Sequence, residues 1–346
     1  MPLLEAHRLR VDLSTHRGSV TAVRDMSFTL DRGETLGLVG ESGCGKSMTA
    51  LALMGLLPGN GTATGSIRLH GQELLGLRDR SWREVRGRRM AMIFQEPMTA
   101  LNPVHRIGQQ IAEPMRLHLD MSAEAAQRKT IELLERVGIA DPARRVDSFP
   151  HQFSGGQRQR IMIAMALAAD PEVLIADEPT TALDVTVQKQ VLQLIADLVT
   201  ERGMSLILIS HDLGVIAQNV QRVLVMYGGH VVENGSTSDI FARPAHPYTR
   251  GLLASRPSLA HRLIAHRSDR LPTIPGSVPD LLHMPAGCPF STRCAFAQSA
   301  CHVAIPPEIT LASSHHVRCG VPEAIAPNSF TGNHFDGGHG QLPQSA

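Results

Sequence analysis

The sequence predicts an α/β fold with a parallel-sheet core, and two features of the chain support this prediction. Short apolar segments typical of buried strands alternate with segments of helical composition, and a glycine-rich segment directly follows the first strand. The predicted strands are residues 35–39, 91–94, 173–176 and 206–209, and the predicted helices are residues 48–57, 124–137, 161–169 and 185–201. In such a fold, ligands bind at the carboxyl ends of the strands.

Length and charge limit the kinds of protein that this chain can be. Its 346 residues exceed an ordinary domain of roughly 100–200 residues, which suggests one large domain with an extension. Its 33 Lys and Arg residues balance 32 Asp and Glu residues without any block of like charge, so a nucleic-acid or anionic-lipid partner is not favoured. The N-terminus shows no targeting pattern, and no apolar run reaches the ~18–20 residues of a membrane span. We expect a cytoplasmic protein that acts on membranes only through partners.

The segment after the first predicted strand has the pattern of a phosphate-binding loop. Gly40-Glu41-Ser42-Gly43-Cys44-Gly45-Lys46-Ser47 matches G-x-x-x-x-G-K-[ST] between a strand and a helix, which disfavours a chance glycine-rich turn. Glycines let backbone N–H groups face a phosphate, and the helix N-terminus adds partial positive charge. We expect Lys46 to reach the β- and γ-phosphates and Ser47 to bind Mg²⁺. The predicted nucleotide-binding residues of this segment are Gly40, Ser42, Gly43, Cys44, Gly45, Lys46, Ser47 and Met48.

A pair of carboxylates follows the apolar strand at residues 173–176. This strand would deliver Asp177 to a metal ion and Glu178 to an attacking water. Solvated acids at a strand end are the simpler interpretation. It is disfavoured here because a phosphate loop precedes the pair on a compatible strand.

Further motifs give the chain a family resemblance. The segment Phe153-Ser154-Gly155-Gly156-Gln157-Arg158-Gln159-Arg160 resembles the LSGGQ signature of ABC ATPases. Gln95, Thr181-Ala182-Leu183-Asp184 and Ser210-His211-Asp212 are similar to the family's Q-loop, D-loop and switch histidine, and they occur in the family's order. The resemblance implies catalytic roles for Glu178, His211 and Gln95, magnesium binding by Ser47, Gln95 and Asp177, and nucleotide contacts by Ser154, Gly155, Gly156, Gln157 and Asp184.

The resemblance also implies an architecture and an assembly. The fold would be a P-loop NTPase (RecA-like) core with a small antiparallel β subdomain and an α-helical signature subdomain, at about residues 96–160, within an ATPase domain at residues 1–250. Two such subunits, identical or homologous, would pair head to tail, so that residues 154–156 of one close over ATP and Mg²⁺ held by residues 40–47 of the other. Two transmembrane permease subunits and an extracytoplasmic solute-binding protein are the other implied partners. They would hold the chain peripherally at the cytoplasmic face of the inner membrane.

Several segments resemble one ABC subfamily, the peptide and nickel importers. Residues 96–103 and 246–253 are similar to the dipeptide/oligopeptide permease ATPases, and residues 274–279, 287–290 and 293–294 are similar to that subfamily's C-terminal extension. The resemblance implies an ATP-hydrolysing subunit that energises uptake of di- or oligopeptides. Nickel complexes and other small solutes stay open as cargo, because selectivity should reside in the binding protein and the permeases.

The expected extension, residues 251–325, is predicted to be irregular because prolines recur along it, and four cysteines cluster in it. Cys288, Cys294, Cys301 and Cys319 have the spacing C-x5-C-x6-C-x17-C, which matches neither zinc ribbons nor ferredoxin runs. Four thiolates nevertheless complete one ligand shell, and the resemblance implies a [4Fe–4S] cluster, with Zn²⁺ or free thiols as alternatives. The tail at residues 326–346 has a composition typical of disorder. We expect solvated side chains, rather than metal ligands, at four histidines: His315, His316, His334 and His339.

Two other classes of protein remain as alternatives. One is a non-transport ABC ATPase that acts on DNA and uses the cysteines as a zinc finger. The short interval between the phosphate loop and the signature, and the lack of a basic stripe, disfavour it. The other is an exporter motor, which is disfavoured because such ATPases are often fused to membrane spans and lack this extension.

Overall fold

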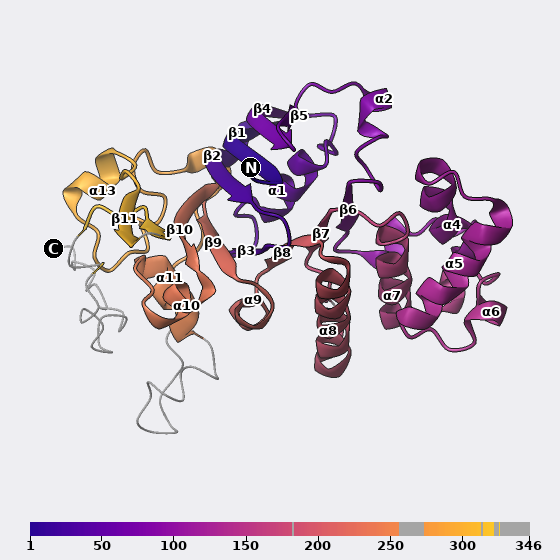
Figure 1. Ribbon diagram of the computed structural model, residues 1–346. Coiled ribbons are helices and arrows are strands. Elements are labelled where there is room, and N and C mark those ends of the chain that lie inside the picture. Colours follow the sequence, from indigo (N-terminus) through magenta and orange to yellow (C-terminus); the bar gives the residue numbers. More distant parts are fainter. Residues whose placement is uncertain (182, 256–272, 313, 322–324, 326–346) are drawn as a thin grey trace.

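The computed structural model describes residues 1–181, 183–255, 273–312, 314–321 and 325 (Figure 1). Its centre is a mixed sheet with the strand order β11-β12-β10-β9-β3-β8-β7-β6. These strands are β3 (Thr35–Val39), β6 (Met90–Ile93), β7 (Val173–Asp177), β8 (Ser205–Ser210), β9 (Arg222–Tyr227), β10 (His230–Ser236), β11 (Ile309–Ala312) and β12 (His315–Val317). Strands β9, β3, β8, β7 and β6 run parallel, and β10, β12 and β11 each join antiparallel to their neighbour. The predicted parallel core is confirmed, and it carries an antiparallel edge.

A second sheet covers one face of the centre. It is antiparallel, with the strand order β2-β1-β4-β5, which agrees with the β subdomain implied by the resemblance. Its strands are β1 (Leu4–Thr15), β2 (Gly18–Leu30), β4 (Gly61–Leu69) and β5 (Gln72–Glu73). Helix α1 (Lys46–Leu53) contacts β1 and β2 on one side and β7 of the central sheet on the other. The helix that follows the phosphate loop is therefore held between two sheets.

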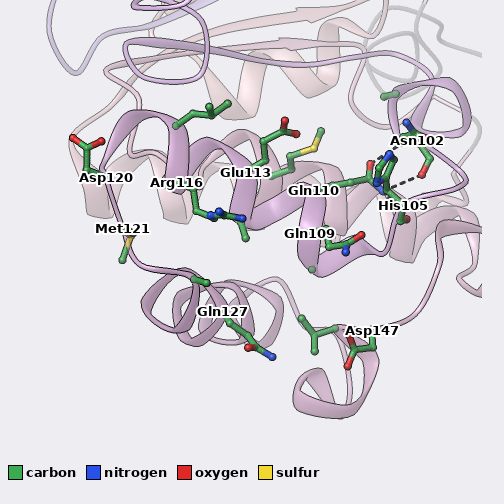
Figure 2. A pocket seen from close by; sticks show the side chains of 17 residues that line it. Asn102, His105, Gln109, Gln110, Glu113, Arg116, Asp120, Met121, Gln127 and Asp147 are labelled. Atoms are coloured by element: carbon green, nitrogen blue, oxygen red, sulfur yellow. Dashed lines mark hydrogen bonds between the residues drawn. The ribbon is translucent and has the colours of Figure 1, made fainter.

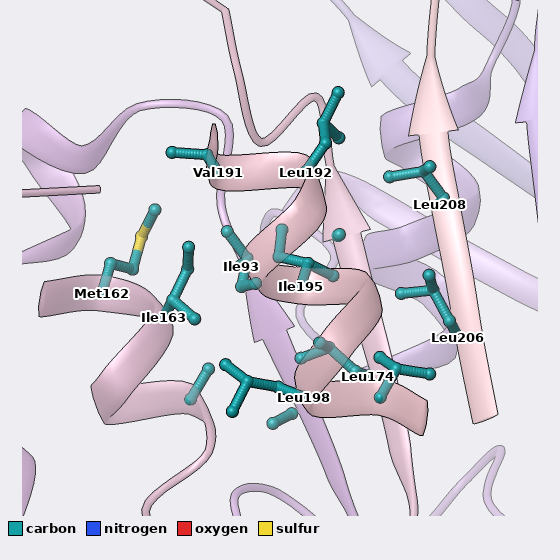
Figure 3. Packing of buried hydrophobic residues seen from close by; sticks show 14 of the residues in the cluster. Ile93, Met162, Ile163, Leu174, Val191, Leu192, Ile195, Leu198, Leu206 and Leu208 are labelled. Carbon is teal, nitrogen blue, oxygen red and sulfur yellow. The ribbon is translucent and has the colours of Figure 1, made fainter. Parts of the chain in front are cut away.

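Helices cover the other face of the central sheet. They are α7 (Gly155–Ala166), α8 (Val185–Arg202) and α9 (Leu213–Asn219). Figure 3 shows side chains of α7 and α8 packed with Leu174 and Leu206 from the strands. The intervening strand residues Ile175 and Ile207 pack on the α1 side instead. Since alternate residues of a strand point to opposite faces, each strand is apolar on both sides. Burying one such side chain contributes roughly 1.5–3 kcal/mol.

A group of helices forms the end of the molecule remote from the C-terminal extension (Figure 1). It consists of α3 (Pro97–Ala100), α4 (Ile107–His118), α5 (Ala123–Arg136), α6 (Pro142–Arg145), η1 (Pro150–Gln152) and the adjoining α7. Helices α4, α5 and α7 contact one another. The short helix α2 (Asp79–Trp82) precedes β6 and lies outside this group.

The extension is more regular than the sequence predicts. Its elements are η2 (Leu281–His283), α13 (Ser299–Val303), β11 and β12, and the helices α10 (Thr237–Ala242) and α11 (Pro247–Ala254) lead into it. Strand β12 pairs with β10 and so joins the central sheet. The expectation for His315 is wrong, because this side chain is buried and its Nε2 atom lies 2.8 Å from Oε1 of the buried Glu233. The predicted tail, with His334 and His339, lies outside the described residues.

Candidate nucleotide-binding site

The phosphate loop at residues 40–47 connects β3 to α1 and is pressed against backbone on two sides. A Cβ atom at Gly40 would lie 2.2 Å from the carbonyl oxygen of Met226, and one at Gly45 would lie 2.2 Å from that of Ala22. Gly43 and Gly45 also have positive φ angles, +79° and +105°. The sequence needs glycine here because a side chain would clash or force a strained backbone.

Lys46 is buried at the start of α1 and crosses beneath the loop. Its Nζ atom donates hydrogen bonds to the carbonyl oxygens of Gly40 (2.9 Å) and Glu41 (3.1 Å). The same atom lies 4.0 Å from Oε1 of Glu178. No side chain caps α1 at its N-cap residue, Gly45. The helix therefore presents N–H groups and a cation together, which is a suitable arrangement for a phosphate.

A hydroxyl and a carboxylate meet beside the loop. Ser47 Oγ donates to Asp177 Oδ1 at 3.2 Å, and Asp177 is only 4% exposed. Burial raises the pKa of Asp177, and the adjacent Glu178 raises it further, while Ser47 and Lys46 act in the opposite direction. A buried carboxylate that lacks a full countercharge, next to a hydroxyl, is a donor set that Mg²⁺ prefers. The residues present fit both ATP and its metal ion.

Glu178 follows β7, and three further polar side chains contact its carboxylate. Its Oε2 atom accepts hydrogen bonds from Thr181 Oγ1 (3.0 Å) and Gln95 Nε2 (3.4 Å), and His211 Nδ1 lies 3.2 Å away. Gln95 follows β6 and His211 follows β8, so parallel neighbouring strands deliver the group to one edge of the sheet. Thr181 was named in the sequence only as part of a motif, and its contact with Glu178 could not be read from spacing.

The signature residues lie apart from this cluster. Ser154 caps α7, because its Oγ atom accepts a hydrogen bond from the N–H of Gln157, while Gln157 Oε1 accepts one from the N–H of Ser154. A Cβ atom at Gly155 would meet nothing within 4 Å, and one at Gly156 would lie 3.1 Å from Val187. Within the described part of the chain, no hydrogen bond or ion pair joins residues 154–157 to the phosphate loop. The open end of α7 is therefore available to another molecule.

Three other predicted residues have local roles in the structure. Asp184 caps α8 by accepting hydrogen bonds from the N–H groups of Thr186 and Val187, both at 3.0 Å. Cys44 is buried in the phosphate loop, and this burial raises the pKa of its thiol. Met48 is partly buried against the apolar cluster around α1.

The cysteines of the extension lie near one another without forming a ligand shell. The N–H of Cys288 donates to the carbonyl oxygen of Cys301 at 2.8 Å. Burial raises the pKa of Cys288 to about 11 and that of Cys294 to about 12, and the neighbouring thiols, including Cys319, reinforce both shifts. Among the residues that the structure describes, no group of three or more His, Cys, Asp or Glu side chains is arranged to hold a metal ion. The side-chain arrangement therefore gives the predicted metal centre no support.

A polar hollow in the helix group is a separate feature (Figure 2). It has a volume of about 1160 Å³ and lies beside α4 and α5. Its lining includes Asn102, His105, Gln109, Glu113, Arg116 and Asp147. None of the predicted nucleotide-binding residues lines this hollow, so its volume is no evidence that the nucleotide binds there.

Known families match two parts of the chain. Residues 23–181 match the family described as ABC transporter, and residues 232–301 match the C-terminal region of oligopeptide/dipeptide transporters. A peptide import ATP-binding protein of Brucella abortus is 51% identical over 319 residues, which cover 92% of this chain and 94% of the relative. A peptide ABC transporter ATP-binding protein of Sinorhizobium fredii is 51% identical over 314 residues, or 89% and 92% of the two chains. These matches favour a transporter over an ATPase that acts on DNA.

Solved structures agree with this fold. An ATP-binding cassette solved as a dimer with ADP and Pi has a TM-score of 0.61 at 24% identity, and the match covers 68% of this chain and 98% of that chain. A subunit of an ABC transporter complex from Clostridium perfringens has a TM-score of 0.58 at 25% identity, with coverage of 70% and 91%. Within the described residues, no helix has both the length and the apolar character to cross a membrane. The chain belongs to the ABC transporter family of ATPases and carries the C-terminal region of its oligopeptide/dipeptide branch.

Proposed function

We propose that this chain is the ATP-binding and ATP-hydrolysing subunit of an importer that takes up di- or oligopeptides through separate permeases. The cluster of Lys46, Ser47, Asp177 and Glu178 at the ends of β3 and β7 is the observation that carries the ATPase role. The peptide cargo is supported by the C-terminal match and by the names of the relatives. In this proposal, residues 1–250 are the ATPase domain and residues 251–325 are the extension.

Each residue of the cluster has a role in the proposed reaction. When bound with ATP, Mg²⁺ neutralises phosphate charge and helps to orient the terminal phosphate. Lys46 would exchange its carbonyl partners for phosphate oxygens, and Ser47 and Asp177 would provide oxygens for the metal ion. Glu178 accepts hydrogen bonds from Gln95 and Thr181 and is positioned to accept one from the attacking water. Gln95 and His211 both contact the Glu178 carboxylate. They would line the space in which the water meets the terminal phosphate.

The open end of α7 supports a head-to-tail pair of ATPase subunits. In a phosphate complex, the N–H groups of Gly155 and Gly156 and the Ser154 hydroxyl would reach the γ-phosphate held by the partner. The partner is a second copy or a homologous ATPase. Two permease subunits and an extracytoplasmic solute-binding protein complete the assembly, which places this chain at the cytoplasmic face of the membrane.

An iron–sulfur cluster or Zn²⁺ on the four cysteines is a further part of the proposal. The clustering of Cys288, Cys294, Cys301 and Cys319 in the sequence supports it, but a ligating arrangement would require their thiols to rotate and lose protons. The role of such a centre would be structural. It would hold together an extension that is poor in apolar residues.

Reconstitution tests the proposed function. The chain is purified with its permeases, placed in liposomes with the solute-binding protein, and supplied with ATP on its own side of the membrane. We expect ATP-dependent uptake of labelled peptides, and a Lys46→Ala complex should show none. Peptide-independent ATP hydrolysis with uptake of only a metal complex or another solute would contradict the assigned cargo, while absence of ATP hydrolysis would contradict the ATPase role.

A further inference from the structure

The C-terminal extension reaches the phosphate loop through Arg293. Its Nη1 atom donates to Glu41 Oε2 at 2.7 Å and its Nη2 atom donates to Glu41 Oε1 at 3.2 Å. Glu41 is the second residue of the loop, and 252 positions separate it from Arg293. The Arg293 side chain is 4% exposed and that of Glu41 is 28% exposed. Two parallel hydrogen bonds in a largely buried setting fix the direction of the carboxylate as well as its charge.

Arg293 is itself held in place. Its Nε atom donates to the carbonyl oxygen of Pro275 at 2.8 Å, and Nη1 lies 3.3 Å from the hydroxyl of Tyr227. Burial lowers the pKa of Arg293, but the hydrogen bonds with Glu41 and Tyr227 outweigh it and the net shift is upward. The guanidinium therefore stays charged, and its orientation is set by the extension rather than by solvent.

The backbone of Glu41 has a second anchor. Its N–H donates to the hydroxyl of Tyr248 at 2.8 Å. Tyr248 is fully buried, and burial raises its pKa, so the hydroxyl stays neutral. Phe290 of the extension packs on both Tyr227 and Tyr248, with ring centroids 5.2 Å and 5.4 Å apart. The extension thus supports both tyrosines that border the loop.

All of the polar groups of Glu41 are engaged in this arrangement. The side chain pairs with Arg293, the N–H with Tyr248, and the carbonyl oxygen accepts a hydrogen bond from Lys46 at 3.1 Å. An unpaired carboxylate at this position would repel a polyphosphate a few residues away. A loop that shifts would also misdirect the N–H groups on which phosphate binding depends.

We infer that Arg293 and Tyr248 are positioning residues for the phosphate loop and that the C-terminal extension is a built-in part of the ATP site. This inference rests on the proposed function, because it takes residues 40–47 as the site of ATP. Arg293 neutralises and orients the Glu41 carboxylate, and the Tyr248 hydroxyl fixes the backbone N–H of the same residue. Weakening either contact lowers the affinity for nucleotide phosphates more than it lowers the turnover of bound ATP.

The test uses the full-length chain with Mg²⁺ and a fluorescent ATP analogue, followed by ATPase kinetics in the permease complex. The Arg293→Gln variant should raise the Kd about tenfold, which corresponds to about 1.4 kcal/mol, and should raise KM with a smaller change in kcat. Glu41→Gln/Arg293→Gln should bind more tightly than Arg293→Gln, because the repelling carboxylate is gone. Tyr248→Phe keeps the ring and removes only the acceptor, so it should raise the Kd several-fold in a folded protein.

Asp280→Asn provides the matched control. Asp280 also ties the extension to the rest of the chain, through an exposed ion pair with Arg17 at 3.3 Å, but it lies outside the phosphate-loop contacts. This variant should keep the wild-type Kd. Wild-type affinity in both Arg293→Gln and Tyr248→Phe would overturn the inference. An affinity loss that follows thermal stability alone, without rescue by Glu41→Gln, would also overturn it. A wild-type chain that binds no ATP would instead refute the proposed function itself.

Discussion

The Nδ1 atom of His211 lies 3.2 Å from the Oε2 atom of Glu178, which joins the ends of β8 and β7 beside the phosphate loop. The same oxygen accepts hydrogen bonds from Thr181 and Gln95. Three side chains from separate segments thus contact one carboxylate oxygen.

Replacing Glu178 by Gln should separate ATP binding from hydrolysis. The amide keeps the shape of the side chain but cannot accept a proton, so the ATPase rate should fall about 10²–10⁴-fold while the Kd for ATP stays near the wild-type value. Single-turnover hydrolysis and nucleotide titration measure the two quantities. Wild-type turnover in this variant would refute the assigned role of Glu178.

Replacing Thr181 by Val should have a milder effect on the same step. The valine keeps the volume and removes one hydrogen bond to the carboxylate, which should lower the rate by about tenfold. ATP binding should be unchanged. A loss as large as that of Glu178→Gln would show that Thr181 does more than orient the acid.

Alanine at Gly45 should disrupt the phosphate loop. A Cβ atom there would lie 2.2 Å from the carbonyl oxygen of Ala22, at a φ angle of +105°, so the loop must move and ATP affinity should fall more than tenfold. Gly33 is the matched control, because its φ is +71° but a Cβ atom would meet nothing within 4 Å. Gly33→Ala should cost about 1–2 kcal/mol of stability and leave ATP affinity intact. Equal affinities in the two variants would contradict the role of close packing.

Acid should destabilise the fold through two buried histidines. Burial lowers the pKa of His246 to about 4, and that of His230 to about 4, from an ordinary value of 6.5. As the pH falls from 6.5 towards 4, the unfolded chain binds protons that the folded chain does not, so the free energy of unfolding decreases. The expected contribution of His246 is at most about 3 kcal/mol.

A His246 variant isolates this contribution. In the fold, Nδ1 of His246 accepts a hydrogen bond from the N–H of Tyr248 at 3.1 Å and caps α11. Asn at this position supplies an acceptor that does not titrate. Urea unfolding at pH 7 and pH 5 should show a smaller loss of stability in His246→Asn than in the wild type. Equal losses of stability in the two proteins would show that groups other than His246 cause the pH dependence.

Metal analysis tests the cysteine site. If the four thiols bind a [4Fe–4S] cluster, protein purified without oxygen should contain about four iron atoms per chain and absorb visible light. Cys294→Ser should lose both signals, while Cys44→Ser should keep them because Cys44 lies in the phosphate loop. Zinc without iron would select the alternative metal, and absence of both would leave the cysteines as free thiols.

The sequence predicted the elements that have a local signal. Residues 35–39 are β3 without change, because an apolar run ends there in a glycine loop. Helix α1 ends earlier than predicted, since Gly55 takes a φ angle of +60°. Helix α7 begins at Gly155 rather than 161 because two glycines obscure its start, although the Ser154 and Gln157 pair was a capping signal.

Other features depend on contacts that no local pattern encodes. The sequence does not indicate the β1–β2 hairpin, because register shifts near Leu9 and Val11 interrupt the alternation of buried and exposed residues. The motifs located the acids, the lysine and the signature. They could not reveal that Arg293 meets Glu41, because this contact arises only when the extension folds back on the sheet.

A structure of the Glu178→Gln complex with ATP, Mg²⁺ and every natural partner tests the head-to-tail pairing most directly. We expect Ser154 and the N–H groups of α7 from one ATPase subunit to contact the γ-phosphate held by the phosphate loop of the other. A complex in which ATP occupies the loop while the signature of the facing subunit points away from the γ-phosphate would contradict it.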